Sequence, residues 1–186
     1  MRALQHIRAS VQGFTLYELV ITMAIASILA VAALPGFFST IERNRIVGQN
    51  NELLAAFGTA RSEAIRRNAV AGVCARNAAG DACATDEWNR GWIVWADTNR
   101  NNVFNAGADE VLRSSELSAK DRLAGAQFNI LFGPRGTHVE PGTGNVRTTD
   151  DVLELKPDAC EAGLKNVRTL TIRTTGIVGT VTSECT

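Results

Sequence analysis

The chain has no net charge, very few histidines and no closely spaced pair of cysteines. Its 19 Lys and Arg residues equal its 19 Asp and Glu residues, so the total charge gives no attraction to nucleic acid or to an anionic surface. Only His138 lies beyond residue 13, and no nucleophile motif stands beside it, which argues against a Ser-His-Asp or Cys-His catalytic site. Gly142-Thr143-Gly144 lacks the further glycines of a phosphate-binding loop. We therefore expect neither an enzyme nor a cofactor.

Four cysteines are present, and all of them follow the long apolar segment near the N-terminus. This distribution is typical of a domain in an oxidising compartment. Three pairings are possible, and we favour Cys74 with Cys83 and Cys160 with Cys185 because each pair closes a short loop. Zinc binding is the alternative, but the sequence has no C-x-x-C spacing and a single imidazole beyond residue 13. Disulfides are therefore predicted, and no metal site.

The longest apolar run is residues 14–34, which read FTLYELVITMAIASILAVAAL and contain a single charge, Glu18. A helix of this length matches the roughly 30 Å hydrocarbon core of a bilayer. Residues 1–13 carry Arg2 and Arg8 and resemble a targeting leader. Removing this leader leaves 17 basic and 19 acidic side chains. An ordinary signal peptide has a shorter apolar region, and a carboxylate within the span costs about 2.5–3.5 kcal/mol, so Glu18 needs a specific explanation.

The residues around the start of this run, Gly13-Phe14-Thr15-Leu16-Tyr17-Glu18, resemble the prepilin cleavage motif of type IV pilins and pseudopilins. The resemblance implies that prepilin peptidase cuts between Gly13 and Phe14 on the cytoplasmic side and methylates the new N-terminus at Phe14. It also implies that Glu18 pairs with the N-terminal amine of a neighbouring subunit, and that the helix kinks at Pro35. Phe14 and Glu18 are four residues apart and share one helix face, where an amine and a carboxylate can partly neutralise each other.

The helical pattern continues beyond the apolar run and becomes amphipathic over residues 35–68. A 3.6-residue periodicity predicts one buried stripe, made of Leu53, Phe57, Ala60 and Ala64. Residues 14–68 would together form a helix of about 80 Å, interrupted or bent near Pro35. The arginine-rich run 61–67 could be a basic patch for DNA, but Glu63 is placed to pair with Arg66 or Arg67, so a solvated face with internal ion pairs is favoured.

Beyond residue 68 the apolar periodicity changes to two, which predicts a β-rich domain over residues 69–186. The expected strands are Val70–Ala75, Trp92–Asp97, Glu110–Leu117, Phe128–Phe132, Val152–Lys156, Leu170–Thr174 and Ile177–Thr182. Thr174-Thr175-Gly176-Ile177 and Gly133-Pro134-Arg135-Gly136 are typical turn sequences between them. The expected fold class is α+β, with a long N-terminal helix packed against an antiparallel sheet domain.

Several segments of this region are similar to the GspH/FimT family of minor pilins and pseudopilins. They are Ala60–Ile65, Trp88 with Gly91-Trp92, Val111–Arg113 and Phe132–Gly136. The resemblance implies a pilin-like fold, in which two small antiparallel sheets wrap around the helix. It also implies a subunit of a type IV pilus or a type II secretion pseudopilus, with other major and minor pilins or pseudopilins and prepilin peptidase as partners. The domain would lie in the periplasm, anchored by one inner-membrane helix with a cytoplasmic N-terminus.

Two binding alternatives come from the same region of the sequence. Asp97 to Asn101, with Asn105 and Asp109, offers alternating oxygens for calcium, but Asn102 and Ala108 occupy the positions where an EF-hand needs glycine and glutamate. Turns that satisfy their own backbone are the favoured interpretation. Some FimT-type pilins bind DNA for natural transformation through an arginine-rich stretch after a glycine. The matching segment here, 176–179, has no arginine, so DNA binding remains the second choice.

Overall fold

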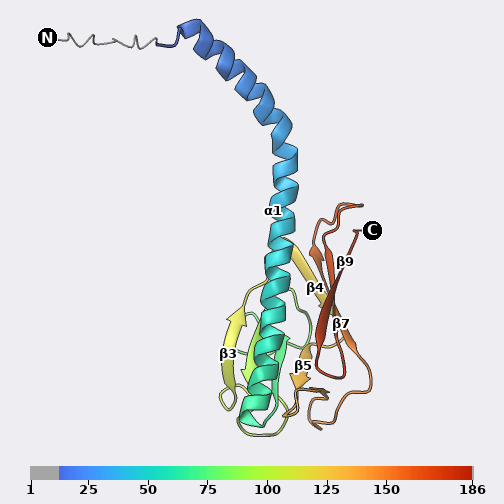
Figure 1. Cartoon of the computed structure of the whole chain (residues 1–186). Helices are drawn as coiled ribbons and strands as arrows, with labels where there is room; N and C mark the ends of the chain where they lie inside the picture. Colours follow the sequence, from blue (N-terminus) through green and yellow to red (C-terminus); the bar gives the residue numbers. More distant parts are fainter. Residues whose placement is uncertain (1–12, 186) are drawn as a thin grey trace, which may run out of the picture. The chain divides into compact units, whose positions relative to one another are not determined.

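A computed structural model describes residues 13–185, without the side chains of residues 32–36. Most of the predicted leader, including Arg2 and Arg8, lies outside the described residues. The chain divides into two compact units, Met1–Ile41 and Glu42–Thr186. Helix α1, Leu16–Arg67, passes from the first unit into the second (Figure 1).

In the first unit, α1 exposes its apolar side chains. The large apolar residues among positions 14–31 are exposed, including Phe14 at 84% and Leu16 at 82%. The hydroxyl groups of Thr22 and Ser27 bond back to carbonyls of the same helix, which keeps the polar atoms of the helix internally satisfied. In the part of the chain that the structure describes, no helical stretch is both long and apolar enough to cross a membrane. The side chains at the end of the predicted 14–34 span, and that of Pro35, lie outside the described residues.

The second unit contains two antiparallel sheets. The five-stranded sheet has the order β3-β2-β1-β5-β6, and Val73 at its centre pairs with Val94 on one side and Ile130 on the other. Its strands are β1 (Ala71–Ala75), β2 (Trp92–Ala96), β3 (Glu110–Ser115), β5 (Asn129–Phe132) and β6 (His138–Val139). Strands β1 and β2 are buried on both faces, which explains why they read as continuous apolar runs.

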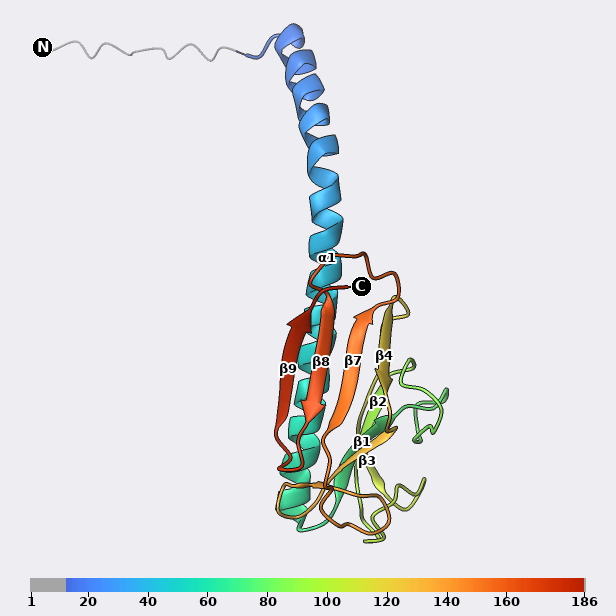
Figure 2. The ribbon, with the colours of Figure 1, turned by 90° about the vertical axis from the view of Figure 1, so that its right-hand side faces the viewer.

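The four-stranded sheet has the order β4-β7-β8-β9, and Figure 2 shows these strands side by side. Its strands are β4 (Asp121–Gly125), β7 (Asp151–Pro157), β8 (Val167–Ile172) and β9 (Val178–Ser183). Burial alternates along β7, so one face packs inward and the other meets solvent. The sequence did not predict β4 or β6. Strand β4 begins with two charged residues and ends in Ala-Gly, and β6 has only two residues, so neither gives a period-two apolar signal.

The end of α1 and the β8–β9 turn both depend on residues with positive φ. Asn68 has φ 49° and donates its N–H to the carbonyl of Ile65, which ends the helix where the sequence predicted. Gly176 has φ 79° in the predicted turn, and a Cβ there would lie 1.8 Å from the carbonyl oxygen of Gly136. No other residue type fits this position without moving the backbone.

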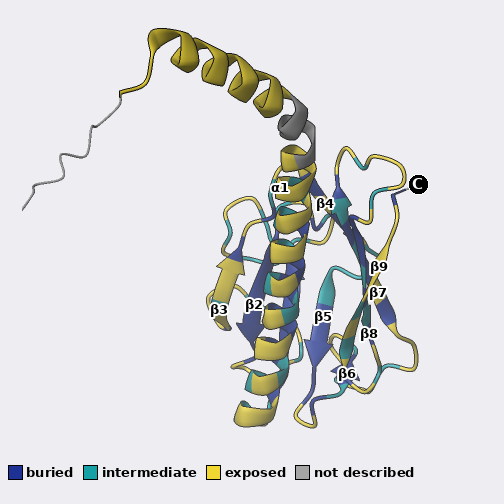
Figure 3. Ribbon diagram, turned by 45° about the horizontal axis from the view of Figure 1, so that its top comes forward, coloured by how far each residue is buried: buried dark blue, intermediate teal, exposed yellow. Residues whose placement is uncertain are grey.

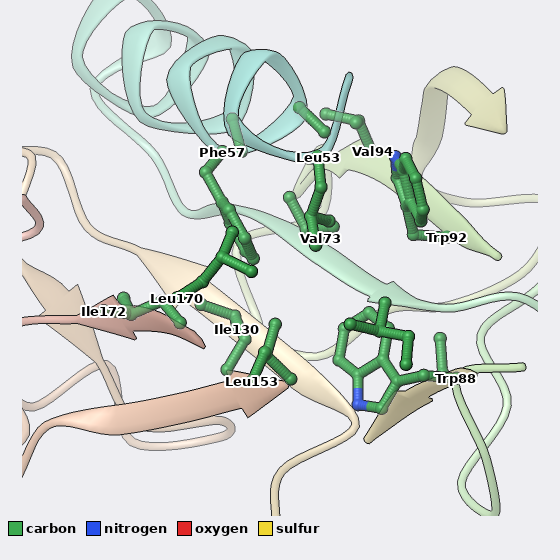
Figure 4. Packing of buried hydrophobic residues seen from close by; sticks show 14 of the residues in the cluster. Leu53, Phe57, Val73, Trp88, Trp92, Val94, Ile130, Leu153, Leu170 and Ile172 are labelled. Atoms are coloured by element: carbon green, nitrogen blue, oxygen red, sulfur yellow. The ribbon is translucent and has the colours of Figure 1, made fainter. Parts of the chain in front are cut away.

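The core lies between α1 and the two sheets. The predicted stripe of Leu53, Phe57, Ala60 and Ala64 is at most 1% exposed, while the opposite face of the helix meets solvent (Figure 3). Figure 4 shows Leu53 and Phe57 pointing from the helix toward side chains of both sheets, which are Val73, Val94, Ile130, Leu153, Leu170 and Ile172. The predicted fold class, a long helix packed on antiparallel sheets, is confirmed.

Candidate assembly site

The N-terminus of α1 is fixed by a side-chain cap immediately after Gly13. Thr15 precedes the first helical residue, and its Oγ1 accepts a hydrogen bond from the N–H of Glu18 at 3.2 Å. The carbonyl of Thr15 accepts the next N–H, from Leu19, at 3.1 Å. Threonine at the N-cap followed three residues later by glutamate is the sequence pattern of a capping box. Helix formation therefore begins directly after the predicted cleavage position.

This cap places Glu18 in the first turn of the helix, among apolar side chains. A carboxylate there interacts favourably with the positive end of the helix dipole. None of the ion pairs among the described residues includes Glu18. The surrounding residues Phe14, Leu16 and Tyr17 are each at least 75% exposed. The isolated subunit thus carries one unpaired carboxylate within a large uncovered apolar surface, which marks a site of association.

Two disulfides stabilise the second unit. The first joins Cys74 of β1 to Cys83, and the second joins Cys160 to Cys185. These are the pairings predicted from the sequence. The Cα atoms of each pair are 5.5 Å apart, which is normal for a bridge. Together they tie a loop to the five-stranded sheet and tie the end of the chain to the segment that follows β7.

The acidic residues of the 97–109 loop serve the backbone of that loop. The carboxylate of Asp97 accepts the N–H groups of Arg100 at 2.6 Å and Asn102 at 2.7 Å. Asp109 accepts those of Thr98 at 2.9 Å and Asn105 at 2.7 Å. Both carboxylates therefore act as turn caps, as the favoured interpretation of this loop expected. Among the described residues, no group of three His, Cys, Asp or Glu side chains is arranged to hold a metal ion.

The arginines at the end of α1 have partners within the domain. Glu63 pairs with Arg66 at 2.5 Å and with Arg67 at 2.7 Å, and these hydrogen bonds lower the pKa of Glu63 to about 2. Arg67 also reaches Glu110 at 2.6 Å. Arg61 donates its Nε to the carbonyl of Gly136 at 2.9 Å. This run is therefore not a free basic patch, and its charges do not support the DNA-binding alternative.

His138 is fully buried, and charged side chains lie beside it. Its Nε2 lies 3.4 Å from Asp151 Oδ2, and Arg147 lies 3.4 Å from the other oxygen of that carboxylate. Burial and the positive charge of Arg147 lower the pKa of His138 to about 4. Burial also raises the pKa of Asp151. The histidine is neutral near pH 7 and is enclosed with its carboxylate, which is unsuitable for contact with a substrate.

Two features of the molecule were not predicted from the sequence. The Thr15 cap is visible in the sequence as Thr-x-x-Glu before an apolar run, so that signal was available. The second feature is a bidentate ion pair between Arg45 of α1 and Asp121 of β4, with three hydrogen bonds of 2.8–3.0 Å. The hydrogen bond to Asp121 raises the pKa of Arg45. No local sequence pattern joins two residues that are 76 positions apart.

Together, these features define a class of protein. A glycine is followed at once by a capped apolar helix with one carboxylate in its first turn, and the same helix continues into the core of a small disulfide-bonded domain of two antiparallel sheets. This is the organisation of a pilin-type filament subunit.

The comparisons with known proteins identify the family. Residues 8–34 match the prokaryotic N-terminal methylation motif, and residues 49–176 match the family described as type II transport protein GspH. The chain therefore belongs to the GspH family, as predicted. It is a minor pilin or pseudopilin, that is, a membrane-anchored structural subunit that assembles with other pilins.

Two crystal forms of the type IV minor pilin FimU from Pseudomonas aeruginosa have a similar fold. The first superposes with a TM-score of 0.53 at 18% sequence identity, over 74% of this chain and 89% of FimU. The second gives a TM-score of 0.51 at 17% identity, over 72% and 90% of the two chains. No curated protein matches the chain. At these identities the similarity to FimU concerns the fold alone.

Proposed function

We propose that prepilin peptidase removes residues 1–13, that Phe14 becomes the N-methylated first residue, and that the mature chain joins a type IV pilus or a type II secretion pseudopilus as a minor subunit. The observation that carries this proposal is the match of residues 8–34 to the N-terminal methylation motif, because those residues include Gly13, Phe14 and Glu18. The anchor lies in the inner membrane with a cytoplasmic N-terminus. Two disulfides are consistent with a periplasmic domain.

Glu18 sets the register of the anchor within the filament. None of the ion pairs among the described residues uses its carboxylate, so the carboxylate is available to the amine of a neighbouring subunit. An unpaired carboxylate in an apolar environment costs about 2.5–3.5 kcal/mol, and this cost disfavours every register that leaves Glu18 alone. The buried charge thereby selects one arrangement of neighbouring helices.

The test compares Glu18→Val with Thr22→Val in the full-length chain. Both changes add an apolar side chain to the same helix, but Thr22 bonds only to a carbonyl of its own helix. We expect Thr22→Val to enter filaments normally and Glu18→Val to remain in the membrane fraction, although mass spectrometry should find both cut after Gly13. Normal incorporation of Glu18→Val would refute the register role. An uncut wild-type chain would refute the proposed processing.

Deletion of the gene separates the two filament systems. Loss of twitching motility with normal exoprotein secretion would assign the chain to a type IV pilus, and the converse would assign it to a type II secretion pseudopilus. A defect confined to natural transformation, together with DNA binding by the purified full-length chain, would contradict the structural assignment.

A further inference from the structure

Arg168 is a cation that the domain buries without an anion. It lies near the start of β8, an inner strand of the four-stranded sheet, where it pairs with Leu155 of β7 and Thr182 of β9, and only 6% of its surface is exposed. Its Nη1 donates to two carbonyl oxygens, those of Lys165 at 3.0 Å and Val167 at 3.1 Å. Buried guanidinium groups are normally paired with a carboxylate, because partial charges of carbonyls do not replace a full counter-charge.

The charges around Arg168 do not offset its positive charge. None of the ion pairs among the described residues includes Arg168 or Arg43. Burial lowers the pKa of Arg168, and the positive charge of Arg43, on α1, lowers it further. Two acidic residues of this region have other partners: Glu42 accepts a hydrogen bond from the amide of Asn166 at 2.9 Å, and Glu184 lies 4.0 Å from Lys165.

The same stretch of α1 contains an arginine that does have a carboxylate partner. Two residues after Arg43, the side chain of Arg45 forms a bidentate pair with Asp121, whose side chain is fully buried. The domain therefore supplies a carboxylate for Arg45 and supplies none for Arg43 or Arg168. A guanidinium group presents its N–H donors in a fork that fits two carboxylate oxygens.

We propose that Arg168 and Arg43 form a receptor for a carboxylate side chain of a neighbouring filament subunit. This carboxylate supplies the missing negative charge when the filament assembles. This inference rests on the proposed function, since it requires a filament neighbour. A carboxylate side chain fits better than DNA, because Arg168 is nearly buried and only Arg43 of the two is exposed, whereas DNA binding needs a row of exposed cations. Arg168 therefore has a counter-charge within the filament that it lacks in the single subunit.

The test uses full-length wild type and Arg168→Met, with Arg173→Met as the matched control on an exposed arginine beyond β8. Wild type and Arg173→Met should enter sheared filaments equally, and Arg168→Met should do so at least about tenfold less. That loss corresponds to about 1.4 kcal/mol of binding free energy. The thermal midpoint of purified Arg168→Met should equal or exceed that of wild type, because the change removes an uncompensated buried charge.

Four outcomes would be decisive. A lower thermal midpoint for Arg168→Met would mean that Arg168 stabilises the fold through its carbonyl bonds, and would overturn the receptor. Equal incorporation of all three proteins would overturn the receptor and leave the proposed function intact. Absence of wild type from filaments would instead refute the proposed function. Binding of duplex DNA or anionic lipid vesicles that is lost in Arg168→Met, with unchanged incorporation, would overturn the assignment to a subunit carboxylate.

Discussion

The ion pair between Arg45 and Asp121 fastens the helix to strand β4, and its removal should have an asymmetric effect. The side chain of Asp121 has no exposed surface, whereas that of Arg45 is 23% exposed. Arg45→Met therefore leaves a carboxylate that water cannot reach. Asp121→Asn leaves a guanidinium group that can turn toward solvent.

The burial of the two partners sets the expected magnitudes. Breaking a buried ion pair at one partner costs about 3–5 kcal/mol when the remaining charge stays buried, so we expect this loss for Arg45→Met. Asp121→Asn should cost about 1–2 kcal/mol, near the value of hydrogen bonds to a charged group. In the double variant Arg45→Met/Asp121→Leu no buried charge remains, so it should be more stable than Arg45→Met alone.

The measurement is urea unfolding of the full-length protein in detergent, followed by tryptophan fluorescence. The matched control is Arg122→Met, which removes the neighbouring pair of Arg122 with Asp158, whose side chains are 61% and 54% exposed. Its cost should stay below about 1 kcal/mol. If Arg45→Met costs no more than this control, or if the double variant is less stable than Arg45→Met, the reasoning about the buried carboxylate is wrong.

Three further predictions concern the same domain. Gly176→Ala should destabilise it by at least about 2 kcal/mol, because the new Cβ meets the carbonyl of Gly136 and the backbone has positive φ; an unchanged urea midpoint would contradict the geometry. Burial lowers the pKa of His138 from 6.5 to about 4, so only the unfolded chain takes up this proton as the pH falls from 6.5 to 4. Stability should then fall by about 3 kcal/mol, and His138→Gln should flatten the curve of stability against pH. Replacing Cys160 and Cys185 by serine should cost about 3.5 kcal/mol from a separation of 25 residues. Reduction also opens the Cys74–Cys83 bridge, so wild type and this variant should become equally stable once reduced, and a remaining difference would contradict the assignment of the loss to the disulfide.

The parts of the fold that follow a local period could be predicted from the sequence. The buried stripe of Leu53 and Phe57 follows the helical repeat, and the turn at Gly176 follows its residue types. The assembly motif from Gly13 to Glu18 is also local, since all its parts lie within one and a half helical turns. Short loops favoured the correct disulfides.

The remaining features depend on residues that meet only in the folded chain. Strand β4 gives little apolar signal in the sequence, because its first residue is Asp121, whose carboxylate accepts hydrogen bonds from Arg45 of α1. The sequence argues against a catalytic role for His138 but does not show that tertiary packing encloses it with Asp151. Likewise, nothing in the sequence around Arg168 indicates that a charged residue in a strand is buried without a counter-ion. Pairing across long sequence separations requires the three-dimensional structure.

The aromatic residues are distributed so that each unit has its own intrinsic optical signal. The three tryptophans, Trp88, Trp92 and Trp95, all lie in the second unit and are at most 1% exposed. The single tyrosine, Tyr17, belongs to the first unit, one residue before Glu18. Tryptophan fluorescence therefore follows the second unit and the tyrosine signal follows the first, without an added dye. If the chain assembles as proposed, the tyrosine would report a change in the surroundings of Glu18 while the tryptophans report that the domain stays folded.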